Sequence, residues 1–224
     1  MAYVSLIPKD ENQHDPLGLR PIAVLPVPLP RLGLPQVLPP QRLAGQLDPP
    51  RPSWGVRGGE AIAAAVSLAI DQEEAEILGE PWITTLLDYV KYFDTIPWSI
   101  LWPLARHWGC PEPLLRASSS FYVNLESRFK FGGHLGPQFR RTNSIAQGCP
   151  LAMLWANVFG TLWARTMSNK APNAKIGVFV DDKTITARSR DGWLHAMKIT
   201  NAFDTAVGHI PNMGKKQGPG QPQC

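Results

Sequence analysis

The chain has 224 residues, of which 44% are hydrophobic and 18% are charged, and eight of them are tryptophan. This composition excludes general disorder, and no apolar run reaches the roughly 20 residues that a membrane-spanning helix needs. We therefore expect no membrane partner, and the lack of an apolar signal at the N-terminus predicts an intracellular location, in the nucleus or the cytoplasm. The net charge of +4 permits a polyanionic partner but does not establish one.

Prolines dominate the N-terminal part of the sequence. Eleven of the 23 prolines lie between Pro16 and Pro52, and their spacing predicts extended strands and loops with little helix. Residues 214–224 (GKKQGPGQPQC) are predicted to form a flexible tail, because polar ends rich in glycine and proline are seldom tied down.

The rest of the chain alternates between helical and extended patterns. A helix is predicted from Gly59 to Leu78, where Gly79 stops it, and ITTLL (83–87) is predicted to be a buried strand that ends on Asp88. The next predicted elements are a short helix from Pro97, a strand over 127–132 with a hairpin turn at 133–136, and a long helix from Pro150. Two strands follow, over 175–180 and 183–187, and a tight Asp181-Asp182 turn joins them. The last predicted helix is capped by Asp191 and ends at Gly208. This order predicts an α+β fold around a small, mostly antiparallel sheet.

Acidic residues stand at the ends of the predicted strands. Asp88 follows one apolar strand, and Asp181 and Asp182 lie at the tip of a hairpin, so neighbouring strands would bring the three carboxylates to one edge of the sheet. Like charges ~4 Å apart repel by about 4 kcal/mol at an effective dielectric constant near 20, and protonation or a divalent cation must relieve that repulsion. Carboxylate oxygens of this kind suit Mg²⁺. The alternative is that the aspartate pair is ordinary turn chemistry.

Six sequence blocks resemble those of reverse transcriptases, especially the enzymes of non-long-terminal-repeat retroelements. LDYVKYFDTI (87–96) resembles their motif D-x-x-K-x-F-D, AQGCPLA (146–152) resembles the motif Q-G-x-P, and VFVDDKTI (178–185) resembles the strand–turn–strand with two aspartates. SLIPK (5–9) and RPIAVLP (20–26) are similar to two finger motifs, and FDTAVGHIPNMGKK (203–216) is similar to a later block with Gly, then Asn, then Lys. The six blocks follow the family's order over nearly the whole chain.

The resemblance implies a right-hand polymerase of the α+β class. Its palm would be a small antiparallel sheet backed by helices, with interleaved fingers and the thumb absent. Residues 1–80 would be mostly fingers, including the proline-rich segment 16–52, and residues 81–213 would be palm, with a fingers insertion near 110–145. The chain would then be a partial reverse transcriptase domain from a polyprotein whose thumb and other domains are missing.

The resemblance also implies roles for single residues. The catalytic and metal-binding carboxylates would be Asp88, Asp181 and Asp182, which would hold two Mg²⁺ ions, with Mn²⁺ as an alternative. Phe93 would exclude a 2′-hydroxyl, although an ordinary core aromatic is the alternative for this residue. The full set of nucleotide-binding residues implied is Lys9, Arg20, Tyr89, Phe93, Gln147 and Gly148, together with Lys215 or Lys216 as the late lysine that assists departure of pyrophosphate. Backbone N–H groups from Tyr89 to Tyr92 would face the triphosphate.

The implied reaction is RNA-templated DNA synthesis, in which a primer 3′-hydroxyl attacks a deoxynucleoside triphosphate by a two-metal mechanism. The implied partners are an RNA template, a DNA primer and a dNTP. Two alternatives remain, namely a catalytically inactive nucleic-acid-binding remnant and an RNA-dependent RNA polymerase. Four basic residues near the predicted hairpin either follow a nucleic-acid backbone or form a solvated face: Arg128, Lys130, Arg140 and Arg141.

Overall fold

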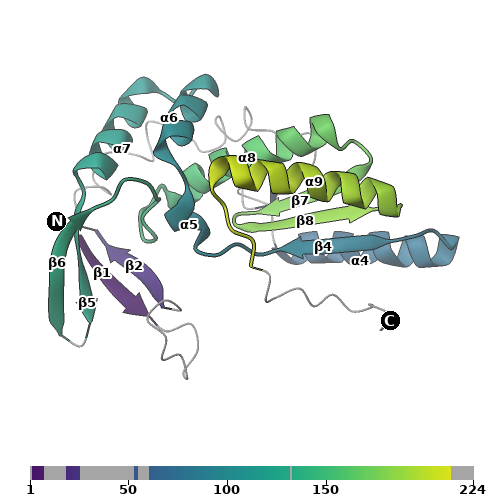
Figure 1. The fold of residues 1–224 in the computed structure, drawn as a ribbon, viewed down its shortest axis with the longest axis horizontal. Coiled ribbons are helices and arrows are strands. Elements are labelled where there is room, and N and C mark those ends of the chain that lie inside the picture. The colour runs from purple at the N-terminus through teal and green to yellow at the C-terminus, as the bar shows by residue number, and fades with distance from the viewer. Residues whose placement is uncertain (1, 8–18, 26–52, 55–60, 132, 213–224) are drawn as a thin grey trace.

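Two four-stranded sheets, accompanied by helices, form the described part of the chain, so the predicted α+β class is confirmed (Figure 1). The computed structural model describes residues 2–7, 19–25, 53–54, 61–131 and 133–212. Within these ranges, none of the helices has the length and apolarity that a membrane crossing requires.

The first sheet joins segments that are far apart in the sequence. Its strand order is β2-β1-β5-β6, with β1 over Ala2–Ile7, β2 over Arg20–Val24, β5 over Glu126–Phe131 and β6 over His134–Arg140. Strand β1 pairs antiparallel with β2 but parallel with β5. Phe131 pairs with His134, so the hairpin turns before the predicted position. Gly133, just before β6, adopts a positive φ of 83°, a conformation that favours glycine.

The second sheet contains the strands that the sequence predicted most clearly. Its order is β3-β7-β8-β4, with β3 over Ser53–Trp54, β4 over Ile83–Leu87, β7 over Ala174–Phe179 and β8 over Asp182–Ala187. Strand β8 pairs antiparallel with both β7 and β4, whereas β3 runs parallel to β7. Each sheet therefore has one parallel pair, and neither is wholly antiparallel.

Helices α8 (Ala152–Lys170) and α9 (Arg190–Val207) pack against β7 and β8 of the second sheet, side by side in Figure 1. The predicted long helix is thus confirmed as α8, and its Trp155, Phe159 and Trp163 are fully buried. Helix α6 (Trp98–His107) packs on α8, and α7 (Glu112–Asn124) packs on α6. The core of the protein lies mainly around α8.

Three helical features differ from the sequence expectations. The short α5 (Tyr92–Thr95) and the longer α7 were not predicted; in α7, three consecutive serines interrupt the apolar pattern. The N-cap of α9 is Ser189, whose side chain accepts a hydrogen bond from the Gly192 N–H, and Asp191 lies in the first turn instead. Gly208 ends α9 with a φ of 76°, as predicted.

Helix α4 (Ala61–Leu78) confirms the predicted helix, but the apolar residues that defined it are exposed. Ile62 and Ile77 are 73% and 84% exposed, whereas Ala75 is buried. Polar contacts connect this helix to the second sheet, because Lys175 of β7 forms an ion pair with Asp71. The helical period was therefore correct, but the apolar stripe is not the buried face.

Candidate active site

At the end of the β4–β8 ladder, Asp88 and Asp182 lie at neighbouring strand ends. Leu87 and Lys183 form the last pair of this antiparallel ladder. Asp88 follows Leu87, and Asp182 precedes Lys183, so the two aspartates extend the same register. Because paired strands lie ~4.8 Å apart, the backbone segments that carry these two carboxylates are side by side.

The tight turn beside them consists of Val180 and Asp181. Phe179 pairs with Asp182, which is therefore the first residue of β8; the sequence analysis was wrong to place Asp182 in the turn. Val180 has a φ of 58°, an unusual conformation for a β-branched residue, and such backbone strain is frequent at functional sites. Burial and the nearby Asp181 carboxylate both raise the pKa of Tyr92. Asp181 thus lies close to the start of α5.

The two faces of the second sheet differ at this point. Leu87 and Lys183 are buried, whereas Leu86 on the other face is 67% exposed. Since side chains alternate along a strand, Asp182, and Asp88 by extension of β4, lie on the face opposite α8 and α9. Asp182 is exposed and Asp88 is half-buried, so solvent or a ligand reaches this edge.

A segment after α9 is bonded directly to Asp88. The side-chain amide of Asn212 donates a hydrogen bond from Nδ2 to Asp88 Oδ2 at 3.1 Å, and its backbone N–H donates to the Asp88 carbonyl at 2.8 Å. The Val90 N–H donates to the Ile210 carbonyl at 2.9 Å, so this N–H, one of those expected to face a triphosphate, is already used. Asn212 lies in the last of the six sequence blocks, 203–216, for which only a lysine had a predicted role.

A buried charged network lies beneath the carboxylates. Lys183 is 1% exposed, and its Nζ lies 3.7 Å from Asp204 Oδ1 and 4.1 Å from the centre of the Tyr89 ring. The Tyr89 hydroxyl donates to Asp204 Oδ2 at 3.0 Å. Burial lowers the pKa of Lys183 to about 8, although the Asp204 carboxylate opposes this shift. The network joins β8, α9 and the residue after Asp88, and it occupies the Tyr89 side chain.

His209, which follows α9, packs against this network. Its ring centre lies 4.9 Å from that of Tyr92 and 5.2 Å from that of Phe159, and its backbone N–H donates to the Asp204 carbonyl. Burial, followed by the charge of Lys183, lowers the pKa of His209 to about 3. The imidazole is therefore neutral near pH 7.

The Gln147-Gly148 loop, which precedes α8, is bonded to β2 of the first sheet. The Ala23 N–H of β2 donates to the Gln147 carbonyl at 2.6 Å. Gly148 has a φ of 114°, and a Cβ atom at this position would lie 2.2 Å from the Ala23 carbonyl oxygen. Glycine is thus required for a close backbone approach, and the backbone that approaches it belongs to β2.

The remaining sequence-predicted residues are divided between the two sheets and the undescribed segments. Phe93 is half-buried, packs against the core and meets the Tyr92 ring edge to face. Arg20 is exposed at the start of β2, and alternation puts it on the face opposite Pro21. Lys9, Lys215 and Lys216 lie outside the described residues.

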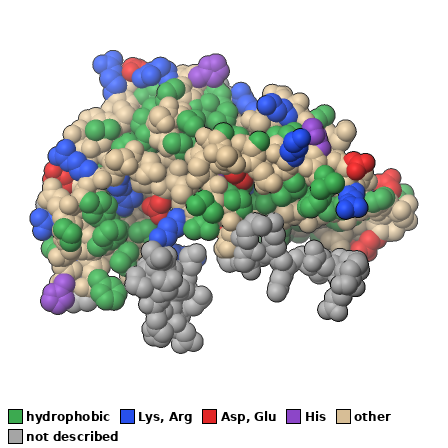
Figure 2. Space-filling model, viewed as in Figure 1, with side chains coloured by type: hydrophobic (Ala, Val, Ile, Leu, Met, Phe, Trp, Pro, Cys, Tyr) green, Lys and Arg blue, Asp and Glu red, His purple; other side chains and the backbone are tan. Residues whose placement is uncertain are grey.

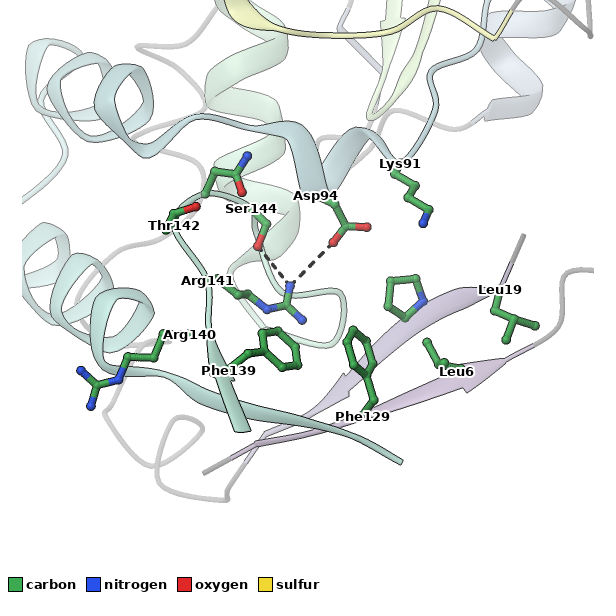
Figure 3. Close-up of a pocket in the computed structure, with 12 residues that line it drawn as sticks. Leu6, Leu19, Lys91, Asp94, Phe129, Phe139, Arg140, Arg141, Thr142 and Ser144 are labelled. Atoms are coloured by element: carbon green, nitrogen blue, oxygen red, sulfur yellow. Dashed lines mark hydrogen bonds and ion pairs between the residues drawn. The ribbon is translucent and has the colours of Figure 1, made fainter. Parts of the chain in front are cut away.

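A pocket of about 480 Å³ opens between the first sheet and α5 (Figure 3). Phe129 and Phe139 stack in it at 4.7 Å. The Arg141 guanidinium donates to Ser144 Oγ at 3.0 Å and lies 3.7 Å from Asp94. Burial lowers the pKa of Arg141 and raises that of Asp94. The structure therefore makes Arg141 an internal residue of this pocket.

The basic residues near the β5–β6 hairpin do not act alike. Arg140 forms an ion pair with Glu126 at 2.7 Å, and its side chain points away from the pocket in Figure 3. Arg128 donates a hydrogen bond to Gln138 Oε1 at 3.5 Å, so with Arg140 and Arg141 three of the four basic residues considered as contacts for nucleic acid are engaged within the chain. On the face seen in Figure 2, basic side chains are dispersed and do not form one patch.

The carboxylates suit a divalent cation in type and in placement on the strands. The described ranges contain no group of three or more His, Cys, Asp and Glu side chains placed to hold a metal ion. Mg²⁺, however, is usually bound by one or two carboxylates, and substrate phosphates and water complete its coordination. Two aspartates at adjacent strand ends therefore fit a cation whose coordination shell is completed by substrate and water.

Comparisons with known proteins agree with this arrangement. Residues 41–218 match the family model described as reverse transcriptase (RNA-dependent DNA polymerase). No curated protein matches the chain. Among solved structures, the fold is similar to apo telomerase from Candida tropicalis truncated from its C-terminal domain, with a TM-score of 0.66 and 14% identity over 98% of this chain and 51% of that chain.

Telomerase from Candida albicans in complex with the TWJ fragment of telomeric RNA is similar as well, with a TM-score of 0.65 and 11% identity over 96% of this chain and 41% of that chain. The present chain thus spans about half of these telomerase chains or less, and at such identities the likeness concerns the fold. The family model, in contrast, covers most of the sequence, including the three aspartates and Asn212. The chain therefore belongs to the reverse transcriptase (RNA-dependent DNA polymerase) family.

Proposed function

We propose that the chain carries the catalytic centre of an RNA-directed DNA polymerase, which extends a DNA primer on an RNA template with deoxynucleoside triphosphates. The observation that carries this proposal is the end of the β4–β8 ladder, where Asp88 and Asp182 are adjacent in a chain of the reverse transcriptase family. Carboxylates at neighbouring strand ends are what a phosphoryl-transfer site needs to hold divalent cations.

In this proposal Asp88, Asp181 and Asp182 hold two divalent cations, Mg²⁺ or Mn²⁺. When bound, such ions activate the attacking hydroxyl and stabilise the leaving pyrophosphate. The half-buried position of Asp88 and its bonds to Asn212 support a fixed carboxylate at this point. The effect of the Asp181 carboxylate on the pKa of Tyr92 supports a place for Asp181 near α5.

The nucleotide would lie between these carboxylates and the first sheet. Phe93 would exclude a 2′-hydroxyl, and Gln147 and Gly148 would contact the nucleotide and the template base. Their link to Ala23 supports this placement, because it keeps the loop close to β2. Tyr89 would contribute through its backbone, since its side chain is buried. Arg20, Lys9 and Lys215 would contact the triphosphate as basic groups.

We also propose an origin in a non-long-terminal-repeat retroelement, on the basis of the six sequence blocks. The first sheet would belong to the fingers, formed by residues 1–80 and an insertion near 110–145, and the second sheet to the palm, within residues 81–213. The RNA fragment bound by the telomerase of Candida albicans supports an RNA partner for a fold of this kind.

Primer extension on an RNA template tests the function. We expect the chain to incorporate dNTPs in Mg²⁺, and we expect Asp88→Asn and Asp181→Asn each to lower the rate by roughly 10³-fold or more. Each change is nearly isosteric, so the unfolding temperature should stay close to that of the wild type. Full activity in either variant would refute the assignment of that carboxylate.

The same assay separates the alternatives. RNA binding without incorporation in either Mg²⁺ or Mn²⁺ would indicate a catalytically inactive remnant. Preferential incorporation of ribonucleotides would indicate an RNA-dependent RNA polymerase, and it would contradict the role given to Phe93.

A further inference from the structure

We infer that Asn212 is the positioning residue of the Asp88 carboxylate, which it orients for cation binding. This inference rests on the proposed function, because it assumes that Asp88 is a cation ligand. It starts from one contact, the hydrogen bond of 3.1 Å from Asn212 Nδ2 to Asp88 Oδ2. No role was assigned to Asn212 by the sequence analysis.

The chemistry of this contact suits a carboxylate that must bind a cation. An ionised carboxylate accepts hydrogen bonds only, so the amide must present its NH₂ group to Asp88. The amide is uncharged and therefore does not neutralise Asp88, whereas a lysine or arginine in the same place would do so. Partners of this kind fix the orientation of ligating groups.

The backbone holds Asn212 in register with Asp88. The Asn212 N–H donates to the Asp88 carbonyl at 2.8 Å, the Val90 N–H donates to the Ile210 carbonyl at 2.9 Å, and Tyr89 and Pro211 form an antiparallel bridge. Residues 210–212 thus lie as a short extra strand against residues 88–90. The side-chain bond is consequently part of an extended contact and follows from the register.

The segment before Asn212 is anchored to the core. His209 is 5% exposed, and its N–H is bonded to the carbonyl of Asp204. Asp204 in turn accepts a hydrogen bond from Tyr89, the residue next to Asp88. Asn212 and Asp88 are therefore connected to the same buried network from both sides, which restricts the movement of one relative to the other.

Binding of Mn²⁺ to the 224-residue chain tests the inference without relying on catalysis. Free Mn²⁺ is measured by electron paramagnetic resonance during a titration with MnCl₂ alone. We expect Asn212→Ala and Asn212→Leu to weaken Mn²⁺ binding roughly 10-fold, the typical loss when a partner of a metal ligand is removed. Both variants keep the backbone hydrogen bonds. The matched control is Asn201→Leu, at an exposed position of α9, which should bind Mn²⁺ as the wild type does.

Asp88→Asn, measured in the same titration, distinguishes failure of the positioning role of Asn212 from failure of the proposed function. If it loses Mn²⁺ binding while both Asn212 variants bind as the wild type does, the positioning role is wrong and the proposed function stands. If Asp88→Asn itself binds Mn²⁺ normally, the proposed function fails at Asp88. Should Asn212→Leu lower the unfolding temperature, the smaller change Asn212→Ala decides the outcome.

Primer extension gives a second readout that a merely structural role would not change. Loss of orientation should raise the Mg²⁺ concentration needed for half-maximal rate, while saturating Mg²⁺ restores most of kcat. A lower kcat at every Mg²⁺ concentration, with the same half-maximal concentration, would contradict the inference.

Discussion

The two sheets differ in how they accommodate charge. At the second sheet, the side chains of Lys183 in β8 and Asp204 in α9 are 0% and 3% exposed, and they face each other inside the core. In the first sheet, the ion pair between Arg140 and Glu126 has side chains that are 62% and 32% exposed. A buried charge is strongly destabilising when its partner is removed, whereas an exposed ion pair contributes little to the stability of the fold. The candidate active site therefore lies next to an ion pair that is fixed by packing.

The largest expected effect on stability is that of Lys183→Met. The substitution leaves the Asp204 carboxylate buried without its cation, and we expect the free energy of unfolding to fall by about 3–5 kcal/mol. Urea denaturation measures this loss. The matched control in the first sheet is Arg140→Met, for which we expect a change below about 1 kcal/mol.

The double variant Lys183→Met/Asp204→Asn sharpens this comparison. The amide of the new asparagine removes the buried charge but still offers an oxygen to the Tyr89 hydroxyl. We expect it to recover most of the stability lost in the single variant, since a buried ion pair can often be replaced by uncharged groups. Equal losses for Lys183→Met and Arg140→Met would remove the distinction between the sheets.

Alanine substitutions of two glycines with positive φ are expected to lower the free energy of unfolding by intermediate amounts. Gly148→Ala would put a Cβ atom against the Ala23 backbone, and we expect a loss of about 3 kcal/mol from the clash and the backbone strain together. Gly133 has a φ of 83° but no atom within 4 Å of its Cβ position, so Gly133→Ala should cost only about 1 kcal/mol. Urea denaturation of both variants checks the difference, and similar losses would contradict a close contact at Gly148.

The smallest expected effect, about 2 kcal/mol between pH 7 and pH 5, is a dependence of stability on pH that arises from His209. Its pKa is about 3 in the folded protein and 6.5 when unperturbed, so between these values the unfolded chain binds a proton that the folded chain excludes. The contribution is therefore fully present above pH 6.5 and is lost as the pH falls towards 3, with a slope of at most about 1.4 kcal/mol per pH unit.

Comparison of the wild type with His209→Phe at pH 7 and pH 5 isolates this slope. Phenylalanine fits the aromatic surroundings of His209 and does not titrate. We expect the wild type to lose more stability than the variant at pH 5. The same loss in both proteins would show that His209 is protonated in the folded state.

Strands β4, β7 and β8 of the second sheet, and helix α8, could be predicted because their sequences carry local signals, whereas the two-residue β3 was not predicted. Strand β4 is a short apolar run, β7 and β8 are separated by only two residues, and α8 carries large apolar residues at helical spacing. The parallel pairing of β1 with β5 could not be predicted, since no local pattern records a partner so far along the chain.

The contacts around the candidate site were harder to predict than its position. A strand end and a turn rich in aspartate pointed to Asp88, Asp181 and Asp182. Lysine is seldom fully buried, so no local pattern indicated that Lys183 pairs with Asp204. The role of Asn212 depends on a side-chain contact that forms only when residues 210–212 align with residues 88–90.

The most direct test of the account is a crystal structure of the chain with primer, RNA template, nucleotide and MnCl₂, in which anomalous scattering locates manganese. We expect a manganese ion within about 2.2 Å of an Asp88 carboxylate oxygen and of an oxygen from Asp181 or Asp182, a distance typical of carboxylate ligands of such ions. A bound nucleotide with no manganese at Asp88 would contradict it.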